Sequence, residues 1–527
     1  MKKKTIVTIV LSSVFALSAV CLAACNGKKP EEKPGEKDAW RDQGIWLTEN
    51  ALLPTAAAEL PDSNHKRTDN VSVHDPSVFR DPKDGTYYVF GTHFAVASSY
   101  DLIEWTQEAS DNEYQVLYGD ESVTVSGVEW PKALEDTVRL VKPVATGSNA
   151  IKTTWAPDVE YLNGKYYMYY SITGGFGSSA SAIARVEADN VLGPYSNNKI
   201  LLQSVSADEE NFVSEASGGK PNCIDSELFF DKDGKLWMVY GSHFGGVYIK
   251  ELYNEGENIG LPKEEGAGKL LWKGGNKVVE GPFVYYNATT KYYYLMTTYG
   301  ALMTDYNMHV ARSENPDGPY VDVSGKDMAT LTAAEAGNTY GNKVANNFRF
   351  DRDGHGQTNG YAAMGHNSVI KDADGNYYAI YHVRRQTKSG TVNAPHNLAV
   401  SKIYFNKEGW PVMSPTFYVG EAAGLVTAAQ AAGDYDIVLH STTTTVTSVA
   451  SESYTLAADG KITKGGTEVG TWSMTSDYYI SLTINSVTYS GVVAAGWDPY
   501  ATENYQTGVY TITAVSNTGA SLWGLSK

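Results

Sequence analysis

The sequence predicts an all-β protein in which a five-bladed β-propeller is followed by a small β-barrel or β-sandwich domain. Two observations support this prediction. Five hairpin-like stretches of one pattern recur at intervals of 55 to 86 residues, and such recurrence is typical of a ring of similar sheets. From Gly433 onward the pattern changes to short alternating segments, which is typical of half-buried strands in a small barrel or sandwich.

Each of the five stretches has the same order of parts. A polar or acidic residue opens an apolar strand, a tight turn follows, and an aromatic strand returns. Asp84-Gly85, Asn163-Gly164 and Asp233-Gly234 are such turns, and pairs of this kind are a strong hairpin signal. The stretches occupy residues 74–91, 155–170, 224–240, 280–295 and 365–381.

An ionisable residue stands near the start of every stretch: Asp75, Asp158, Asp225, Glu280 and His366. If these positions are equivalent, the side chains converge on the axis, because the innermost strand of each blade lines the central channel. Carboxylates that lie so close need separated pKa values, a partner or a nearby cation. Two carboxyl groups with different pKa values are what glycoside hydrolysis requires. The alternative is that each residue only begins a strand or a turn.

Composition limits the classes of function. With 527 residues the chain is long enough for two or more domains, and its net charge of −18 argues against nucleic acid and against a basic membrane-binding face. The 37 tyrosines suit strand packing and also offer flat faces for sugar recognition.

The N-terminus predicts export. Three lysines at positions 2–4 precede an apolar run over residues 6–24, which indicates a secretory signal; a transmembrane helix is the alternative. The run ends in Leu22-Ala23-Ala24-Cys25, which resembles a bacterial lipobox, so Cys25 is the expected lipid anchor. Residues 25–66 form a tether and lead-in. Cys223 then stands alone, which leaves neither an intramolecular disulfide nor a cysteine metal site.

The predicted propeller fills residues 67–421, and a short alanine-rich helix or linker is expected over 422–432. The predicted barrel-like domain fills 433–527, and the Thr442–Thr447 run is expected to be one of its strands. Three tryptophans of this domain are expected in its core rather than in a carbohydrate site: Trp472, Trp497 and Trp523.

Several of these motifs resemble glycoside hydrolase family 43, and within it the endo-1,5-α-L-arabinanases. Trp155-Ala156-Pro157-Asp158 and Glu280-Gly281-Pro282 are typical of the family. More particular to arabinanases are His74-Asp75-Pro76-Ser77, Gly365-His366-Asn367-Ser368, Tyr381-His382-Val383-Arg384 and the segment from Asn307 to Ser313. The resemblance covers most of residues 70–421, and the C-terminal part resembles the barrel domain of larger arabinanases.

The resemblance implies roles for these residues. Asp75 matches the general base, Glu280 the general acid, and Asp158 the acid that orients Glu280 and raises its pKa. His366 matches a histidine beside a calcium ion on the axis. The family inverts configuration, which needs the base and acid carboxyls roughly 6.5–9.5 Å apart. The residues expected to bind substrate are His74, Trp155, Asp225, Ser242 and His243.

The expected protein is therefore a monomeric extracellular hydrolase of arabinan, anchored through Cys25. Two alternatives stay open. Long stretches over residues 107–154 and 203–222 would suit an exo-acting arabinofuranosidase or β-xylosidase of the same fold, because long loops can wall off a groove. A surface glycan-binding protein without turnover is the second, although the full set of acids argues against it.

Overall fold

The computed structural model describes residues 43–61, 71–142, 153–214, 216, 219–274, 279–336, 340–352, 359–498 and 508–527. The chain divides into two compact units, residues 1–39 and 40–527, and the description below concerns the second. The predicted signal and Cys25 lie outside the described residues. Among the described residues, no helix combines the length and apolar character that a membrane crossing needs.

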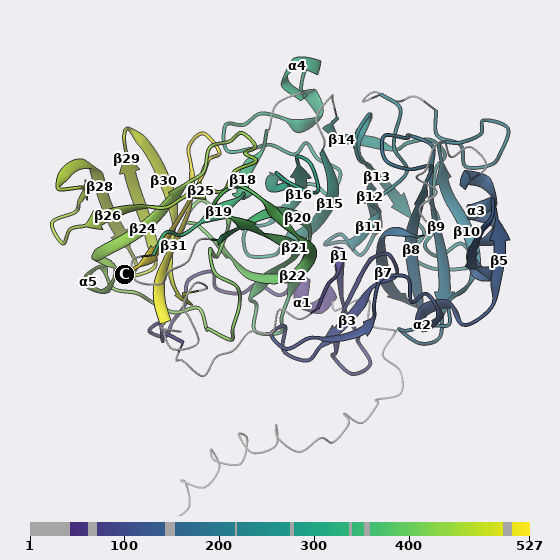
Figure 1. Ribbon diagram of the computed structural model, residues 1–527, viewed down its shortest axis with the longest axis horizontal. Coiled ribbons are helices and arrows are strands. Elements are labelled where there is room, and N and C mark those ends of the chain that lie inside the picture. The colour runs from purple at the N-terminus through teal and green to yellow at the C-terminus, as the bar shows by residue number, and fades with distance from the viewer. Residues whose placement is uncertain are drawn as a thin grey trace, which may run out of the picture. The chain divides into compact units, whose positions relative to one another are not determined.

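Four antiparallel sheets of four strands each follow one another along the chain (Figure 1). The first contains β1 (His74–Arg80), β2 (Tyr87–Thr92), β3 (Val96–Ser99) and β4 (Thr106–Ala109). The second contains β7 (Trp155–Leu162), β8 (Lys165–Thr173), β9 (Ser181–Ala188) and β10 (Ser196–Gln203). The third contains β11 (Glu227–Phe230), β12 (Leu236–Tyr240), β13 (Gly246–Leu252) and β14 (Lys269–Lys273). The fourth contains β15 (Val279–Asn287), β16 (Tyr292–Tyr299), β17 (Asn307–Ser313) and β18 (Asn342–Ala345).

A six-stranded sheet follows, in the order β23-β22-β21-β20-β19-β25. Its strands are β19 (Phe348–Arg349), β20 (Asn359–Lys371), β21 (Tyr377–Thr387), β22 (Val392–Phe405), β23 (Pro411–Met413) and β25 (Val449–Ala450). The leading strands of the sheets contact one another in a cycle: β1 with β7, β7 with β11, β11 with β15, β15 with β20, and β20 with β1. Together the sheets form a propeller-like arrangement, and the expected hairpin turns connect β1 to β2, β7 to β8, β11 to β12, β15 to β16 and β20 to β21.

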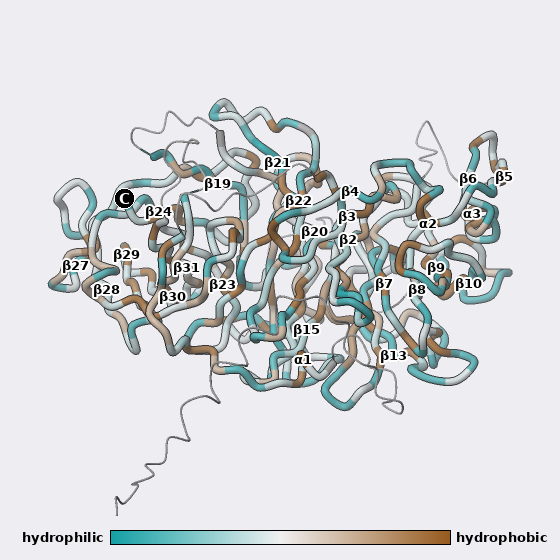
Figure 2. Tube along the Cα trace, turned by 90° about the horizontal axis from the view of Figure 1, so that it is seen from below, coloured by the Kyte–Doolittle hydropathy of each residue, from teal (hydrophilic) through white to brown (hydrophobic). Residues whose placement is uncertain are grey.

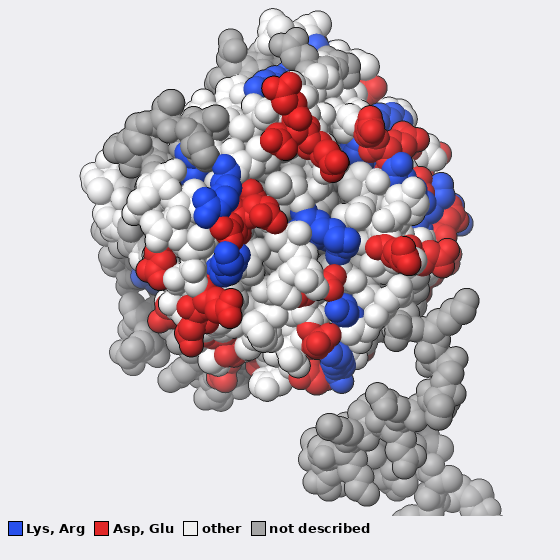
Figure 3. All heavy atoms as spheres, turned by 90° about the vertical axis from the view of Figure 1, so that its right-hand side faces the viewer, with Lys and Arg blue, Asp and Glu red and all other residues white. Residues whose placement is uncertain are grey.

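The long segment before β7 is more ordered than a loop. It contains α2 (Gln115–Tyr118), the hairpin of β5 (Ser122–Val125) and β6 (Val128–Pro131), η1 (Lys132–Leu134) and α3 (Glu135–Val141). Trp130 of this hairpin is buried against the second sheet's aromatic cluster. Acidic and basic side chains are interspersed on the face of the molecule shown in Figure 3.

The C-terminal strands close into a barrel in the order β24-β26-β27-β28-β29-β30-β31-β32. Its strands are β24 (Gly433–Leu439), β26 (Glu452–Leu456), β27 (Lys461–Lys464), β28 (Thr467–Thr475), β29 (Tyr479–Ile484), β30 (Val487–Trp497), β31 (Gly508–Ser516) and β32 (Ser521–Ser526). The three tryptophans at 472, 497 and 523 are buried, and the helix before the barrel, α5, spans only Ala428–Ala431.

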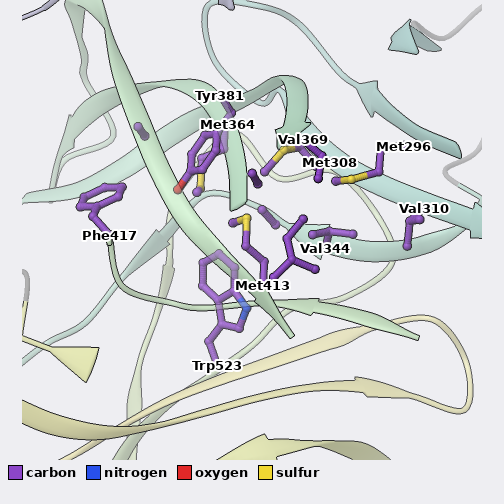
Figure 4. Close-up of a cluster of buried hydrophobic side chains, with 14 of the residues drawn as sticks. Met296, Met308, Val310, Val344, Met364, Val369, Tyr381, Met413, Phe417 and Trp523 are labelled. Atoms are coloured by element: carbon purple, nitrogen blue, oxygen red, sulfur yellow. The ribbon is translucent and has the colours of Figure 1, made fainter. Parts of the chain in front are cut away.

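Apolar packing joins the barrel to the six-stranded sheet. Trp523 of the barrel packs in one buried cluster with Met413, Phe417 and Phe348 (Figure 4). In Figure 2 hydrophobic residues lie mainly along the strands, whereas the connecting turns are mostly hydrophilic. Burial of large side chains on both sides of this contact stabilises it by roughly 1.5–3 kcal/mol for each fully buried side chain.

The Thr442–Thr447 run is not a strand, so that prediction was wrong. Side-chain amides of the propeller-like part donate hydrogen bonds to the backbone carbonyls of this run instead. Asn347 Nδ2 donates to the carbonyls of Thr445 and Val446 at 2.9 and 3.0 Å. Gln386 Nε2 donates to the same Val446 carbonyl at 2.8 Å. The chain then pairs as β25 with β19 of the propeller before it enters the barrel.

Candidate active site

The first strands of the sheets share a local distortion. Ladder pairing is interrupted after His74, Trp155, Glu280 and Gly365. The next residue in each case has a positive φ: Asp75 (51°), Ala156 (37°), Gly281 (57°) and His366 (44°). Asp225 (58°) takes the same conformation just before β11. Such bulges re-aim side chains and are frequent beside active sites.

This register corrects the expectation that the five ionisable residues are equivalent. Asp75, Asp225 and His366 do occupy the bulge position. Glu280 lies one residue before it, and Asp158 lies two residues after it. Because successive side chains of a strand point to opposite faces, the alignment of acids in the sequence does not give their alignment in space.

Asp75 is held from several sides. Thr92 Oγ1 donates to Asp75 Oδ2 at 2.6 Å, and Thr92 itself accepts from the backbone N–H of Ala156 at 2.9 Å. His366 Nδ1 and His74 Nε2 each lie 3.2 Å from Asp75 Oδ1. Burial would raise the pKa of Asp75, but the histidines around it hold this pKa well below its usual value. The carboxylate is therefore ionised.

His366 is the cationic partner of Asp75. Burial would lower the pKa of His366, but the charge of Asp75 and its hydrogen bond raise it to about 9. The two side chains thus form a partly buried ion pair between β1 and β20.

Glu280 accepts three hydrogen bonds. Tyr306 O–H donates to Oε1 at 2.6 Å, Ser242 O–H to Oε2 at 2.8 Å, and His243 Nε2 lies 3.1 Å from Oε2. Burial would raise the pKa of Glu280, but the bond from His243 and the two hydroxyl donors lower it. This differs from the raised pKa that the sequence led us to expect, because these donors stabilise the charged form.

The pKa of Asp225 depends on the charges of both Asp75 and Glu280. It is 6% exposed and accepts from the backbone N–H of Gly281 at 3.3 Å. Burial raises its pKa to about 7, with His366 acting against this rise and the charges of Glu280 and Asp75 adding to it. The sequence predicts only a substrate-binding or structural role for Asp225. The structure adds an electrostatic interaction between Asp225 and the side chains of Asp75, Glu280 and His366.

Asp158 has hydrogen-bond donors of its own. It is fully buried, and its oxygens accept from Ser77 O–H at 2.7 Å and from the backbone N–H of Leu228 at 3.0 Å. Ser77 belongs to the first sheet and Leu228 to the third, so Asp158 connects three sheets. Its carboxylate oxygens accept hydrogen bonds from both neighbouring sheets.

Three histidines lie behind Asp75. His74 stacks on His396 with ring centroids 4.3 Å apart, and His382 lies edge-on to both. Their ligand atoms lie within 4.8 Å of one another, which suggests a metal cluster. However, His382 Nδ1 accepts the backbone N–H of Asp75 at 3.2 Å, so its proton lies on Nε2 and that nitrogen has no lone pair for a metal. Burial lowers the pKa of all three rings, to about 3 for His396.

Aromatic side chains border the acids. Trp155 packs on the 64% exposed Phe176 with centroids 5.0 Å apart. On the side of Glu280, the half-exposed His243 packs near the exposed Phe244 at 6.0 Å. Exposed rings of this kind suit stacking on sugar faces.

A small cavity lies directly beneath the acids. Its lining includes Asp75, Asp225, His366, Ser226 and Asn367. The Ser226 hydroxyl and both polar atoms of the Asn367 amide are buried without a hydrogen-bond partner among the described residues. Unpaired buried oxygens beside carboxylates are the ligands that a hard cation such as Ca²⁺ prefers.

Sequence reasoning missed four residues of the site: Thr92, Tyr306, His396 and Phe176. Thr92 had a signal, because the last residue of the second strand faces His74 in the hairpin register. Tyr306 immediately precedes the arabinanase-like segment from Asn307 to Ser313. The sequence offers no comparable signal for His396 or Phe176.

An ionised carboxylate and a second carboxyl group with its own donors, set at the hub of a propeller-like fold, define the site of a glycoside hydrolase. The comparisons agree. Residues 128–411 match the model of glycosyl hydrolases family 43, and residues 415–524 match a C-terminal lipocalin-like domain. The chain belongs to glycoside hydrolase family 43 and is a glycosidase.

Its relatives include arabinan-degrading enzymes. The chain is 35% identical over 470 residues to extracellular endo-α-(1→5)-L-arabinanase 2 of Bacillus subtilis, covering 86% of this chain and 92% of that protein. The crystal structure of an endo-1,5-α-L-arabinanase from Thermotoga petrophila superposes with a TM-score of 0.75 at 32% identity, covering 90% of this chain and all of that one. An extracellular exo-α-(1→5)-L-arabinofuranosidase of Cellvibrio japonicus is 26% identical over 72% of this chain and 95% of that protein.

Proposed function

We propose that the protein is an extracellular endo-acting hydrolase that cleaves α-1,5-L-arabinofuranosidic linkages of arabinan with inversion. Asp75 is the general base and Glu280 the general acid. The observation that carries this assignment is the separate set of donors around each carboxyl group, with Asp225 electrostatically coupled to both. The substrate class is that named for the relatives of this chain.

The base requires an ionised carboxylate near a water molecule. The lowered pKa of Asp75 supplies the ionised form across the working pH range. The bond from Thr92 fixes Oδ2, and the hydrogen bond from His366 fixes Oδ1, so the orientation of the carboxylate is set before substrate arrives. A water held by Asp75 attacks the anomeric carbon, and Asp75 takes its proton.

The acid requires a proton on Glu280, which the free site disfavours. His243 is the half-exposed donor of the three around Glu280, so an entering sugar displaces it most easily. Loss of that donor lets burial and the neighbouring Asp225 raise the pKa of Glu280. Glu280 then protonates the departing glycosidic oxygen. In this scheme Asp225, rather than Asp158, tunes the acid, and Asp158 holds the sheets together.

We propose that the six-stranded sheet is the fifth blade of the propeller. The cycle of contacts among the first strands, which β20 completes between β15 and β1, supports this interpretation.

We also propose a calcium ion on the axis. The fit is supported by the unpaired oxygens of Ser226 and Asn367 and by the carboxylates beside them. These oxygens would hold it, and His366, which the family resemblance places beside the ion, would act as a ligand only after losing its proton. A bound cation would offset the repulsion among the acids and stabilise their charged forms.

The names of the relatives support an extracellular protein, and the lipobox-like sequence supports a lipid anchor at Cys25. The test of the proposed function is a time course on linear debranched arabinan, followed by oligosaccharide chromatography. We expect arabino-oligosaccharides of several lengths in the first minutes, and no products from Asp75→Asn or Glu280→Gln. Monosaccharide alone from the start would indicate an exo enzyme, and binding without new reducing ends would indicate a glycan-binding protein.

A further inference from the structure

We infer that His382 is a positioning residue that holds the base and the acid at a fixed separation. This inference rests on the roles proposed above for Asp75 and Glu280. His382 lies on β21 and is fully buried, so it does not reach substrate. Its ring nevertheless contacts the supports of both carboxyl groups, one through a hydrogen bond and the other through stacking.

The first contact fixes the backbone of Asp75. His382 Nδ1 accepts the Asp75 N–H at 3.2 Å, at a residue whose φ is 51°. A left-handed conformation is unfavourable for a non-glycine residue, so the surrounding structure must hold it in place. A backbone N–H buried without a partner would make this conformation still less favourable. His382 therefore stabilises the bulge that directs the Asp75 carboxylate into the site.

The second contact fixes the support of Glu280. The ring of Tyr306 stacks on His382 with centroids 5.5 Å apart and planes 5° from parallel. The hydroxyl of the same Tyr306 donates to Glu280 Oε1 at 2.6 Å. Gly365, which pairs with His382 across the ladder, makes room for this stack, because a Cβ there would lie 2.5 Å from Tyr306 Cδ1.

The two contacts use different parts of the imidazole, so they can be separated by substitution. His382→Asn keeps an acceptor near the Nδ1 position and removes the stacked ring. His382→Phe keeps a stacked ring and removes the acceptor. His382→Ala removes both. Misplacement of a catalytic group by about 1 Å can cost 10²-fold in rate.

The experiment measures kcat and KM on linear debranched arabinan, with the melting temperature of every variant. We expect kcat to fall about 10-fold or more in His382→Asn and in His382→Phe, and about 100-fold or more in His382→Ala, with KM within about threefold of wild type throughout. A purely structural role would lower the melting temperature without this separation of kcat from KM. If His382→Phe does not fold, His382→Asn and His382→Ala still provide the comparison.

His440→Phe is the matched control. His440 is also buried, packs edge-on to Trp523 at 5.0 Å and bonds Ser521, but it lies in the barrel. Its substitution is expected to lower stability and leave kcat unchanged. A folded His382→Ala with kcat within threefold of wild type would overturn the inference. An inactive wild-type protein would instead refute the proposed function, so the two failures are distinguishable.

Discussion

Replacing Asp225 with Asn should stabilise the protein at neutral pH, although it removes a residue of the active site. The folded state raises the pKa of Asp225 from 3.8 to about 7. Between these values the unfolded chain releases the proton first, so stability is lost as the pH rises from about 4 to about 7 and is constant above. At 1.36 kcal/mol per pKa unit the difference corresponds to ~4 kcal/mol at pH 8. Asn cannot ionise and escapes this loss.

The assay is the melting temperature of wild type and Asp225→Asn at pH 4.5, 6 and 8, in EGTA so that calcium does not contribute. The two proteins should melt close together at pH 4.5, where about a quarter of the difference has developed, and the variant should melt roughly 5–10 °C higher at pH 8. The variant should also lose activity, because the charge that raises the pKa of Glu280 is gone. Equal melting temperatures at every pH would refute the electrostatic account of Asp225.

Four further outcomes follow from the same contacts. Tyr306→Phe removes a hydrogen bond to a charged group, worth ~1.5–3 kcal/mol, so the pKa of Glu280 rises and the alkaline limb of kcat/KM moves to higher pH. His243→Ala moves that limb in the same direction; a shift to lower pH in either variant would contradict the assignment. Asp158→Ala leaves the Leu228 N–H without its acceptor and should lower the melting temperature without moving either limb of the pH profile. Arg352→Ala should destabilise the protein by ~3–5 kcal/mol in urea unfolding, because the guanidinium pairs with two buried barrel carboxylates.

The sequence predicted the sheets well but not the register of the acids. Alternating strands with Asp-Gly or Asn-Gly turns carry a local signal, and the expected hairpins are present. A bulge adds one residue to one strand, and a shift of one residue moves a side chain to the other face. Glu280 lies one residue before the bulge position and Asp158 two residues after it, so neither takes the position that Asp75 occupies. The sequence carries no local pattern that predicts these bulges. The tuning role of Asp158 follows from the family resemblance and stays a prediction.

Contacts between segments far apart in sequence were also beyond prediction. The backbone N–H of Asp75 donates to the ring of His382, which lies 307 residues away in the sequence. The hydroxyl of Tyr306 donates to the carboxylate of Glu280. The Thr442–Thr447 run has the β-branched composition of a strand, yet propeller amides take up its carbonyls. Composition gives the tendency of a segment, and tertiary partners decide its conformation.

The six-stranded sheet lies against both sheets that carry the proposed base and acid. It contacts the first sheet, which carries Asp75, and the fourth sheet, which carries Glu280. His366 and His382, the residues that meet Asp75 from this side, both belong to it. The barrel is joined to the same sheet, through β25 and through Ser448, which bonds Gln386 at the end of β21. The barrel and the residues that meet Asp75 from this side are therefore connected through one sheet.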